Sequence, residues 1–285
     1  MENIFEREEI VDFLERCLME DVGEGDITTD AIIPEELAGN AKIIAKDEGV
    51  IAGIKVAEIL FELVDEDLEF ISHFNDGDEV KNGDVIITLK GNLKSILMAE
   101  RVALNFMQRF SGIATATSKY VKEISGTKAR IYDTRKTVPG LRLLDKYAVK
   151  AGGGENHRIG LYDMFLIKEN HITAAGGVTK AIDLCDQYKK DDELDCKIQI
   201  EVRNLDELQE VLKSEKVDMV LIDNFKIDDM ITAVEMVNHK IEVEASGGIT
   251  FENLRKIAET GVDRISIGAL THSVKAFDLS LLIEN

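Results

Sequence analysis

One stretch decides the fold of this chain: KIQIEVRNLDELQEVLKSEKVDMVLIDNFKIDDMITAVEMVNHKIEVEASGGI, residues 197–249. Short apolar runs alternate in it with amphipathic segments of helical spacing, which predicts βα units and a parallel sheet covered by helices. Six such units, and a seventh that is less distinct, favour closure into a barrel. The expected strands are 129–133, 163–168, 197–202, 218–223, 241–246 and 263–268, and the expected helices are 171–190, 205–216, 227–238 and 251–260.

The N-terminal part has no such alternation, and its mixture of helices and strands predicts an α+β domain. The Gly- and Asp-rich segment 21–30 reads as a loop, and the helical stretch 94–124 has a possible break at Gly112. The boundary falls near residue 110, giving an α+β domain at 1–110 and a barrel at 111–272. The remaining expected elements are helices at 6–20 and 54–64 and strands at 41–46, 68–74 and 85–89.

Composition excludes several classes of protein. The 285 residues carry a formal net charge of −21, which argues against nucleic acid or an anionic membrane as the partner. The three cysteines, Cys17, Cys185 and Cys196, lie far apart without CxxC spacing, so disulfide scaffolds and zinc modules are not expected. Neither a signal peptide nor an apolar run of the ~20 residues that a membrane span needs is seen. We therefore expect a cytoplasmic protein.

Chemically rich residues follow each strand of the predicted barrel, where α/β barrels carry their active sites. Between residues 129 and 171, eight basic and five acidic residues give +3 in an otherwise acidic chain, which suggests a polyanionic substrate. The glycine run 152–154 leads into His157 and Arg158, which favours ligand contact. The residues at the strand ends are Thr134, Arg135, Lys136, Lys168, His171, Glu201, Asp223, Asn224, Ser246, Gly247, Gly248, Gly268, Ala269, Leu270 and His272.

Two groups of these residues suggest particular ligands. The glycines at 247–248 and 268 suit phosphate binding by backbone N–H groups, although such glycines also occur in tight strand-to-helix turns. Glu201 and Asp223 suit Mg²⁺ or sugar hydroxyls, but carboxylates there also neutralise a cationic site. The residues alone leave both choices open.

The chain resembles the quinolinate phosphoribosyltransferases almost end to end. The central block 133–172, DTRKTVPGLRLLDKYAVKAGGGENHRIGLYDMFLIKENHI, is the most specific match. The other matching stretches are EDVGEGDITTD (20–30), ERVALNFMQRFSGIAT (100–115), EV (201–202), DN (223–224), EASGGI (244–249) and GALTHS (268–273). Homologues tied to molybdenum transport share the glycine–histidine–arginine loop, but LIKENH here looks more like the enzyme.

The resemblance implies an α/β protein of type II phosphoribosyltransferase-like fold: an N-terminal α+β sandwich, joined by the tail 273–285, and a seven-stranded α/β barrel. It implies a homodimer. It also implies the reaction of quinolinate with phosphoribosyl pyrophosphate to give nicotinate mononucleotide, pyrophosphate and CO₂, in de novo NAD synthesis.

The resemblance also implies roles for individual residues. Arg101, Arg135, His157 and Arg158 would line the quinolinate pocket, with Arg101 supplied by the neighbouring subunit. Thr134 would also contact substrate, and Lys136 and Lys168 would add positive charge. Glu201 and Asp223 would meet the ribose hydroxyls and Mg²⁺-pyrophosphate. The 5′-phosphate would lie among Ser246, Gly247, Gly248, Gly268, Ala269, Leu270 and His272. The catalytic set would be Lys136, Lys168, Glu201 and Asp223.

Two other functions stay open from the sequence. Lys168 at a strand end is also where an aldolase-like barrel carries a Schiff-base lysine, although the surrounding Arg, Lys and Gly residues suit anions better. A non-catalytic protein that binds phosphosugars would show the same glycines and basic residues.

Overall fold

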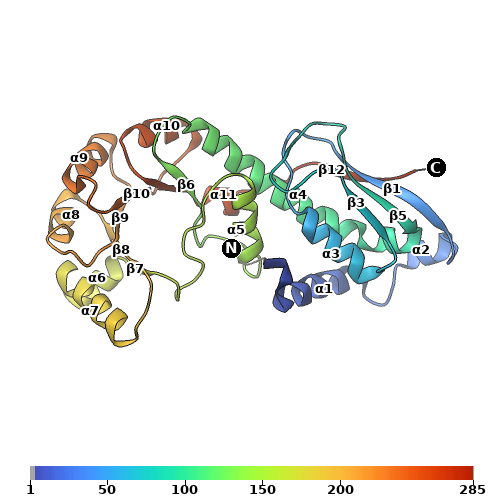
Figure 1. The fold of residues 1–285 in the computed structure, drawn as a ribbon, viewed down its shortest axis with the longest axis horizontal. Coiled ribbons are helices and arrows are strands. Elements are labelled where there is room, and N and C mark those ends of the chain that lie inside the picture. The colour runs from blue at the N-terminus through green and yellow to red at the C-terminus, as the bar shows by residue number, and fades with distance from the viewer. Residues whose placement is uncertain (1–3, 285) are drawn as a thin grey trace. The chain divides into compact units, whose positions relative to one another are not determined.

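The structure, a computed structural model, describes residues 4–284 and divides into two compact units. The first comprises 1–118, 143–153 and 274–285, and the second comprises 119–142 and 154–273. Residues 143–153, which follow the first barrel strand in the chain, thus group with the N-terminal unit. Figure 1 shows the elements of both.

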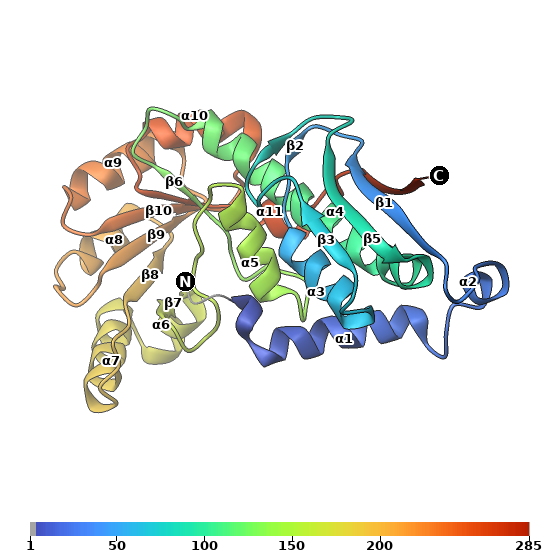
Figure 2. The same cartoon turned by 45° about the vertical axis from the view of Figure 1, so that its right-hand side comes forward.

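The first unit contains a four-stranded antiparallel sheet in the order β12-β1-β5-β3, with helices beside it (Figures 1 and 2). The C-terminal strand pairs with β1, so the tail closes this unit. The strands are β1 (Ala38–Ala45), β3 (Glu69–Ser72), β5 (Val85–Asn92) and β12 (Leu279–Glu284), with a separate pair β2 (Gly49–Val50) and β4 (Glu79–Val80). The helices are η1 (Ile4–Glu6), α1 (Glu8–Val22), α2 (Ile27–Ile32), α3 (Ile54–Val64), and most of α4 (Leu93–Glu123) and α5 (Arg142–Ala151).

The helix α4 runs without interruption through Gly112, so the expected break there is wrong. This glycine is needed for packing: a Cβ would collide with the carbonyl oxygen of Lys275, where the C-terminal segment crosses the helix. The backbone of that segment also bonds α4, because the N–H of Phe277 donates to the carbonyl of Gln108 at 2.9 Å.

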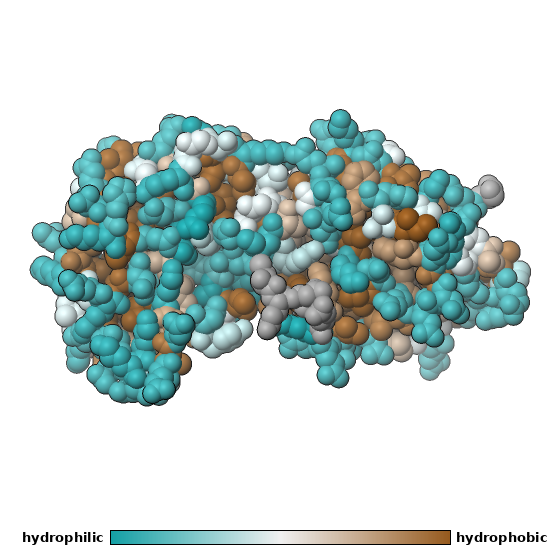
Figure 3. Space-filling view, in the orientation of Figure 1, coloured by the Kyte–Doolittle hydropathy of each residue, from teal (hydrophilic) through white to brown (hydrophobic). Residues whose placement is uncertain are grey.

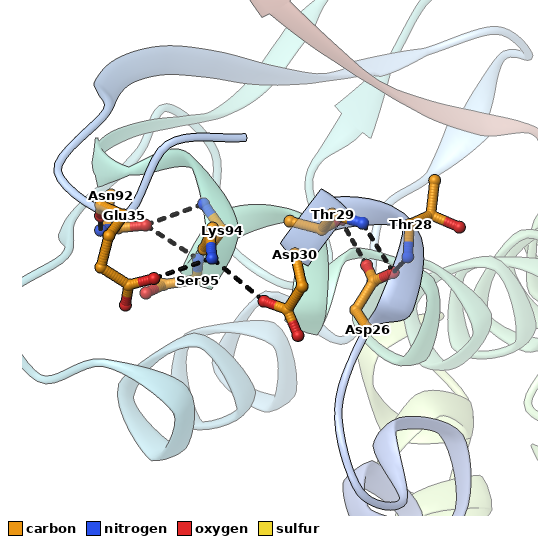
Figure 4. Close-up of polar contacts among 8 residues, drawn as sticks. All are labelled: Asp26, Thr28, Thr29, Asp30, Glu35, Asn92, Lys94 and Ser95. Carbon is orange, nitrogen blue, oxygen red and sulfur yellow. Dashed lines mark hydrogen bonds and ion pairs between the residues drawn. The ribbon is translucent and has the colours of Figure 1, made fainter. Parts of the chain in front are cut away.

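The segment 21–30 is only partly a loop, because α2 begins inside it at Ile27. Asp26 caps this helix: its Oδ1 accepts hydrogen bonds from the N–H groups of Thr28 at 3.1 Å and Thr29 at 3.0 Å (Figure 4). The hydroxyl of Thr29 also donates to Oδ2 of Asp26. This bond is the largest of the causes that hold the pKa of Asp26 below its ordinary value, and the backbone bonds add to it. Six residues are too few to show helical periodicity, so the cap was the available signal.

Lys94, in the first turn of α4, connects α4 to residues 30–35, which include the end of α2. Its Nζ lies 3.1 Å from a carboxylate oxygen of Asp30 and 2.8 Å from one of Glu35 (Figure 4). The side chain of Lys94 is only 15% exposed, whereas the two carboxylates are largely in solvent. One ammonium group therefore holds both ends of the 30–35 segment.

The second unit is built on a six-stranded parallel sheet in the order β6-β11-β10-β9-β8-β7. All six expected strands are present, and most side chains of the central ones are buried, as in sheets covered by helices. The strands are β6 (Arg130–Tyr132), β7 (Phe165–Ile167), β8 (Ile198–Val202), β9 (Met219–Asp223), β10 (Glu242–Ser246) and β11 (Arg264–Ser266). The helices are α6 (Glu169–Ala175), α7 (Val178–Asp191), α8 (Leu205–Val211), α9 (Ile227–Val237), α10 (Phe251–Glu259) and α11 (Ala269–His272).

The less distinct seventh strand of the expected barrel is reduced to a single parallel bridge between Tyr132 and Glu155. The N–H of Glu155 donates to the carbonyl of Ile131 at 2.7 Å, and the N–H of Asp133 donates to the carbonyl of Glu155 at 3.0 Å. The chain that follows Gly154 is therefore held beside β6. This placement brings the next residues, His157 and Arg158, to the carboxyl end of the sheet.

The expected helix 171–190 is two helices, α6 and α7, because Gly176 and Gly177 both have positive φ between them (87° and 140°). No helix among residues 4–284 has the length and apolar character required to cross a membrane. Hydrophilic side chains are spread over both units on the face seen in Figure 3.

Candidate active site

A cavity of about 510 Å³ lies at the carboxyl ends of the parallel strands, entirely within the second unit. Each strand from β6 to β11 contributes a residue at or near its carboxyl end. This is the position that βα architecture gives to an active site. The lining residues are Thr134, Arg135, Lys136, His157, Arg158, Leu166, Lys168, Glu201, Leu221, Asp223, Asn224, Glu244, Ser246, Gly247, Gly248 and Ser266.

Most of the residues expected at the site therefore share this cavity. Gly268, Ala269, Leu270 and His272 do not line it. They are in or next to α11, beside the loop that carries Lys136. A Cβ on Gly268 would crowd the side chains of Lys136 and His272, and the hydroxyl of Thr271 donates to the carbonyl of Lys136 at 2.9 Å.

Arg135 and Arg158 make the cavity strongly cationic. The Nε atoms of both guanidinium groups are buried and have no hydrogen-bond partner. Burial, followed by repulsion from Arg135, lowers the pKa of Arg158, and Asp163 opposes this shift. Arg158 is oriented by a bond from Nη1 to the carbonyl of Met164 at 2.9 Å. Two planar donors with unused capacity are suited to an anion with more than one carboxylate.

Lys168 and Glu201 form an ion pair in the cavity, with Nζ 2.7 Å from Oε2. Lys168 directly follows β7, and Glu201 lies in the adjacent strand β8, so the parallel pairing brings them together. His171 accepts a hydrogen bond at Nδ1 from the backbone N–H of Lys168 at 2.9 Å, which caps α6. His171 therefore supports the backbone of Lys168.

Asn224 and Gly247 form a tightly folded corner at the ends of β9 and β10. Both have left-handed backbones, with φ of 56° and 83°, and the N–H of Asn224 donates to the carbonyl of Ser246 at 2.9 Å. A Cβ on Gly247 would overlap the amide of Asn224. The amide also donates to Oδ2 of Asp223 at 2.8 Å. The left-handed backbone and this close approach together favour glycine at 247, which lines the cavity.

A buried polar network below this rim was not predicted from the sequence. Glu244 lies in β10 with 0% exposure, and its Oε2 accepts a hydrogen bond from Gln199 of β8 at 2.8 Å. Its Oε1 lies 3.3 Å from Nε2 of His157. The backbone N–H of His157 donates to Asp133, another fully buried carboxylate, at 2.8 Å. The available signal was the presence of Gln199 and Glu244 inside strands whose neighbouring positions are apolar.

Arg101 belongs to the first unit, on α4, and its side chain is 57% exposed. Its guanidinium lies 3.7 Å from the carboxylate of Glu100, the preceding residue.

No group of three or more His, Cys, Asp and Glu side chains placed to hold a metal ion occurs in the described part of the chain. Glu201 and Asp223 both line the cavity, but Glu201 is engaged by Lys168 and Asp223 by Asn224. Protein side chains alone thus provide two carboxylates, fewer ligands than Mg²⁺ takes.

Comparison with known proteins assigns the family. Residues 26–111 match the N-terminal domain of quinolinate phosphoribosyl transferase, and residues 113–282 match its C-terminal domain. Quinolinate phosphoribosyltransferase [decarboxylating] 2, mitochondrial, of Nicotiana glauca is 44% identical over 97% of this chain and 82% of its own length. The probable nicotinate-nucleotide pyrophosphorylase [carboxylating] of Bacillus subtilis (strain 168) is 42% identical over 94% of this chain and 91% of its own. The solved nicotinate-nucleotide pyrophosphorylase from Francisella tularensis superimposes with a TM-score of 0.91 at 42% identity, covering 97% of this chain and 96% of that one. The chain belongs to the quinolinate phosphoribosyltransferase family.

Proposed function

We propose that this chain transfers the phosphoribosyl group of phosphoribosyl pyrophosphate to quinolinate and releases pyrophosphate and CO₂. The observation that carries the proposal is the pair of guanidinium groups, Arg135 and Arg158, with buried and unpartnered Nε atoms in one cavity. Quinolinate has two adjacent carboxylates, which two bidentate donors bind together. Lys136 and Lys168 line the same cavity and add positive charge.

The other wall of the cavity suits the phosphoribosyl substrate. Glu201 and Asp223, which line the cavity, would accept hydrogen bonds from ribose hydroxyls. Ser246, Gly247 and Gly248 offer a backbone without bulky side chains for a phosphate, and Gly268, Ala269, Leu270 and His272 would complete that subsite. The support for this assignment is the corner at Gly247, where glycine is favoured.

The mechanism follows from the two subsites. The ring nitrogen of quinolinate attacks C1 of the ribose while the bond from C1 to pyrophosphate breaks, and C1 passes through oxocarbenium character. The ring nitrogen becomes cationic and accepts the electrons released when the 2-carboxylate leaves as CO₂. A proton then adds at C2 to give nicotinate mononucleotide. Positioning and electrostatics do most of the work, with no covalent enzyme intermediate.

Mg²⁺ belongs to this proposal as a companion of the pyrophosphate. Glu201 and Asp223 would supply two oxygen ligands or bind its water molecules, and oxygens of the substrate would complete the shell. When bound, the ion neutralises charge on the leaving pyrophosphate.

The decisive test is a turnover assay. The protein is mixed with Mg²⁺, phosphoribosyl pyrophosphate and either quinolinate or nicotinate, and mononucleotide and CO₂ are measured. We expect turnover with quinolinate and little with nicotinate, because the missing carboxylate leaves a guanidinium unpaired. Binding of phosphoribosyl pyrophosphate without product would instead indicate a phosphosugar-binding protein.

The aldolase alternative is weakened by the ion pair of Lys168. A Schiff base needs a neutral amine, whereas this ammonium group is engaged by Glu201 at 2.7 Å. Borohydride trapping of a carbonyl substrate on Lys168 would support the aldolase and contradict the proposal.

The proposal includes a homodimer in which Arg101 completes the quinolinate pocket of the neighbouring subunit. The role of Arg101 is supported by its exposure on α4. A cytoplasmic location is also part of the proposal, supported by three cysteines without disulfide partners among the described residues. Sedimentation equilibrium and cell fractionation test these two points.

A further inference from the structure

Glu244 is a buried carboxylate in the candidate site that the mechanism above does not use. It is 0% exposed, lies in the body of β10 and lines the cavity. Burial opposes its ionisation, but the polar contacts of Glu244 with His157, Ser266 and Gln199 hold its pKa below the ordinary value of 4.5. Oε2 accepts a hydrogen bond from Gln199, whereas Oε1 faces His157 at 3.3 Å without hydrogen-bond geometry. Burying a carboxylate costs free energy of folding unless hydrogen-bond donors surround it. The donors around Glu244 therefore indicate its role.

The imidazole of His157 has a defined neighbour at each nitrogen. Nδ1 accepts a hydrogen bond from the backbone N–H of Arg158 at 2.8 Å. Nε2 lies 3.3 Å from Oε1 of Glu244. A nitrogen that accepts from an N–H group carries no proton, so the proton of the ring is on Nε2 and faces the carboxylate. The ring is a neutral imidazole in this arrangement.

We propose that Glu244 is a positioning residue that holds His157 as a neutral Nε2–H imidazole, whose Nδ1 in turn fixes the backbone of Arg158. This inference rests on the proposed function, because it concerns how the site grips quinolinate. The charge that meets the substrate carboxylates then comes from the arginines and lysines, and His157 contributes orientation.

The contacts around this pair support a positioning role. Gln199, itself 0% exposed, donates to the second oxygen of Glu244 at 2.8 Å and fixes its carboxylate plane. The backbone N–H of His157 donates to the buried Asp133 at 2.8 Å. The 157–158 segment is thus held at the His157 N–H, at the imidazole and at the Arg158 N–H. A segment held at three points can present the Arg158 guanidinium in one orientation.

The first test replaces Glu244 by glutamine, which keeps the shape and removes the charge. We expect the dissociation constant of quinolinate, measured by calorimetry, to rise at least about tenfold, the effect of losing one hydrogen bond to a charged group. The KM for phosphoribosyl pyrophosphate should stay near that of the wild type, since its subsite is on other residues. A rise in the quinolinate constant below tenfold overturns the proposal.

Glu242→Gln is the matched control. Glu242 lies two residues earlier on β10, at its amino end, and pairs with Arg130 at 2.7 Å and with Arg264. Residues at that end of a βα barrel serve stability, so this variant should bind quinolinate within about twofold of the wild type.

The second test reads the protonation of His157 directly by ¹⁵N NMR of the imidazoles. The chain has five histidines, so the signal is assigned by its loss in a His157→Gln sample. The wild type should show a neutral ring protonated at Nε2, and Glu244→Gln should lose that single form. A doubly protonated ring or an Nδ1–H ring in the wild type overturns the proposal, even if Glu244→Gln does not fold.

These two measurements separate the inference from the proposed function. Absence of quinolinate turnover in the wild type would contradict the proposed function, whereas the NMR state of His157 would still decide the inference.

Discussion

Nζ of Lys168 lies 2.7 Å from Oε2 of Glu201, so groups of opposite charge from adjacent strand ends form an ion pair inside the cavity. The Lys168 side chain is 48% exposed and that of Glu201 is 16% exposed. Exposed pairs of this kind contribute about 0–1 kcal/mol to stability. The pair therefore orients both groups within the cavity and adds little to the stability of the fold.

Glu201→Gln should separate these two effects. The free energy of unfolding should change by less than about 1 kcal/mol, because the pair is partly exposed. The value of kcat/KM for phosphoribosyl pyrophosphate should fall about 10- to 100-fold, the loss of a hydrogen bond to a charged group. Steady-state kinetics and urea unfolding measure the two quantities. Unchanged kinetics would remove Glu201 from the ribose subsite.

Arg135→Lys should lose activity although the charge is retained. An ammonium group cannot reproduce the planar grip of a guanidinium, and two charged hydrogen bonds of about 1.5–3 kcal/mol each are at risk. We expect kcat/KM for quinolinate to fall at least about 100-fold. A kcat/KM near that of the wild type would show that Arg135 does not bind the carboxylates of quinolinate.

Arg130→Lys is the control for that change. Arg130 lies in β6, just before the loop that carries Arg135, but at the opposite end of the strand. Its Nη2 bonds Glu242 at 2.7 Å, and its side chain is 49% exposed. We expect the kinetics with quinolinate to be unchanged, so a loss in Arg135→Lys reports on the site.

The first unit has a strong buried ion pair between Arg109 on α4 and Asp145 on α5. Nε and Nη2 of the arginine donate to the two carboxylate oxygens at 2.9 and 2.8 Å, and Asp145 is 0% exposed. Arg109→Met should lower the free energy of unfolding by about 3–5 kcal/mol, because a buried carboxylate loses two hydrogen bonds from a charged group. Lys55→Met, which breaks an exposed pair with Glu58, should cost less than about 1 kcal/mol by the same urea measurement.

Asp76 should give the stability of this unit a particular pH dependence. Burial raises the pKa of Asp76 above its ordinary 3.8, and bonds from the Tyr147 hydroxyl and the Ile54 N–H only partly oppose this. The folded state then holds the proton more tightly than the unfolded state, so the contribution of Asp76 is greatest below pH 3.8 and declines as the pH rises. The free energy of unfolding of the wild type, minus that of Asp76→Asn, should therefore decrease from about pH 3 to pH 7. A value of this difference that increases with pH would contradict the prediction.

The sheet of the second unit could be predicted because each strand is a short apolar run bounded by helical pattern, and all six strands appear. Helix α2 was missed because a six-residue helix shows no periodicity, and Gly112 reads as a break only until the crossing segment at Lys275 is known. The packing at Gly112 depends on a contact between residues far apart in the sequence.

The candidate site was predictable at its rim and not in its interior. Residues such as Lys168 and Asp223 lie at or just beyond the ends of strands, so their position alone marks them. Glu244 and Gln199 lie within strands, where a polar residue is informative only if its side chain faces the barrel interior and finds a partner. That register comes from strand pairing, which the sequence does not display.

Arg101 provides the last prediction, that each site of a homodimer borrows this residue from the other subunit. Arg101 lies on α4 in the first unit, with 57% of its side chain exposed. A twofold dimer makes two equivalent composite sites. Arg101→Ala and Lys168→Ala homodimers should each be nearly inactive, because every site then lacks one essential cation.

A heterodimer of these two variants distinguishes the arrangements. If Arg101 acts on the neighbouring subunit, one site collects both defects and the other collects neither, so the purified heterodimer should recover about half of the wild-type activity. If Arg101 serves its own subunit, each site keeps one defect and the heterodimer stays inactive. Separate affinity tags on the two chains allow the heterodimer to be isolated before assay. The matched control is a heterodimer of wild-type and Lys168→Ala chains, which should have about half activity in either arrangement.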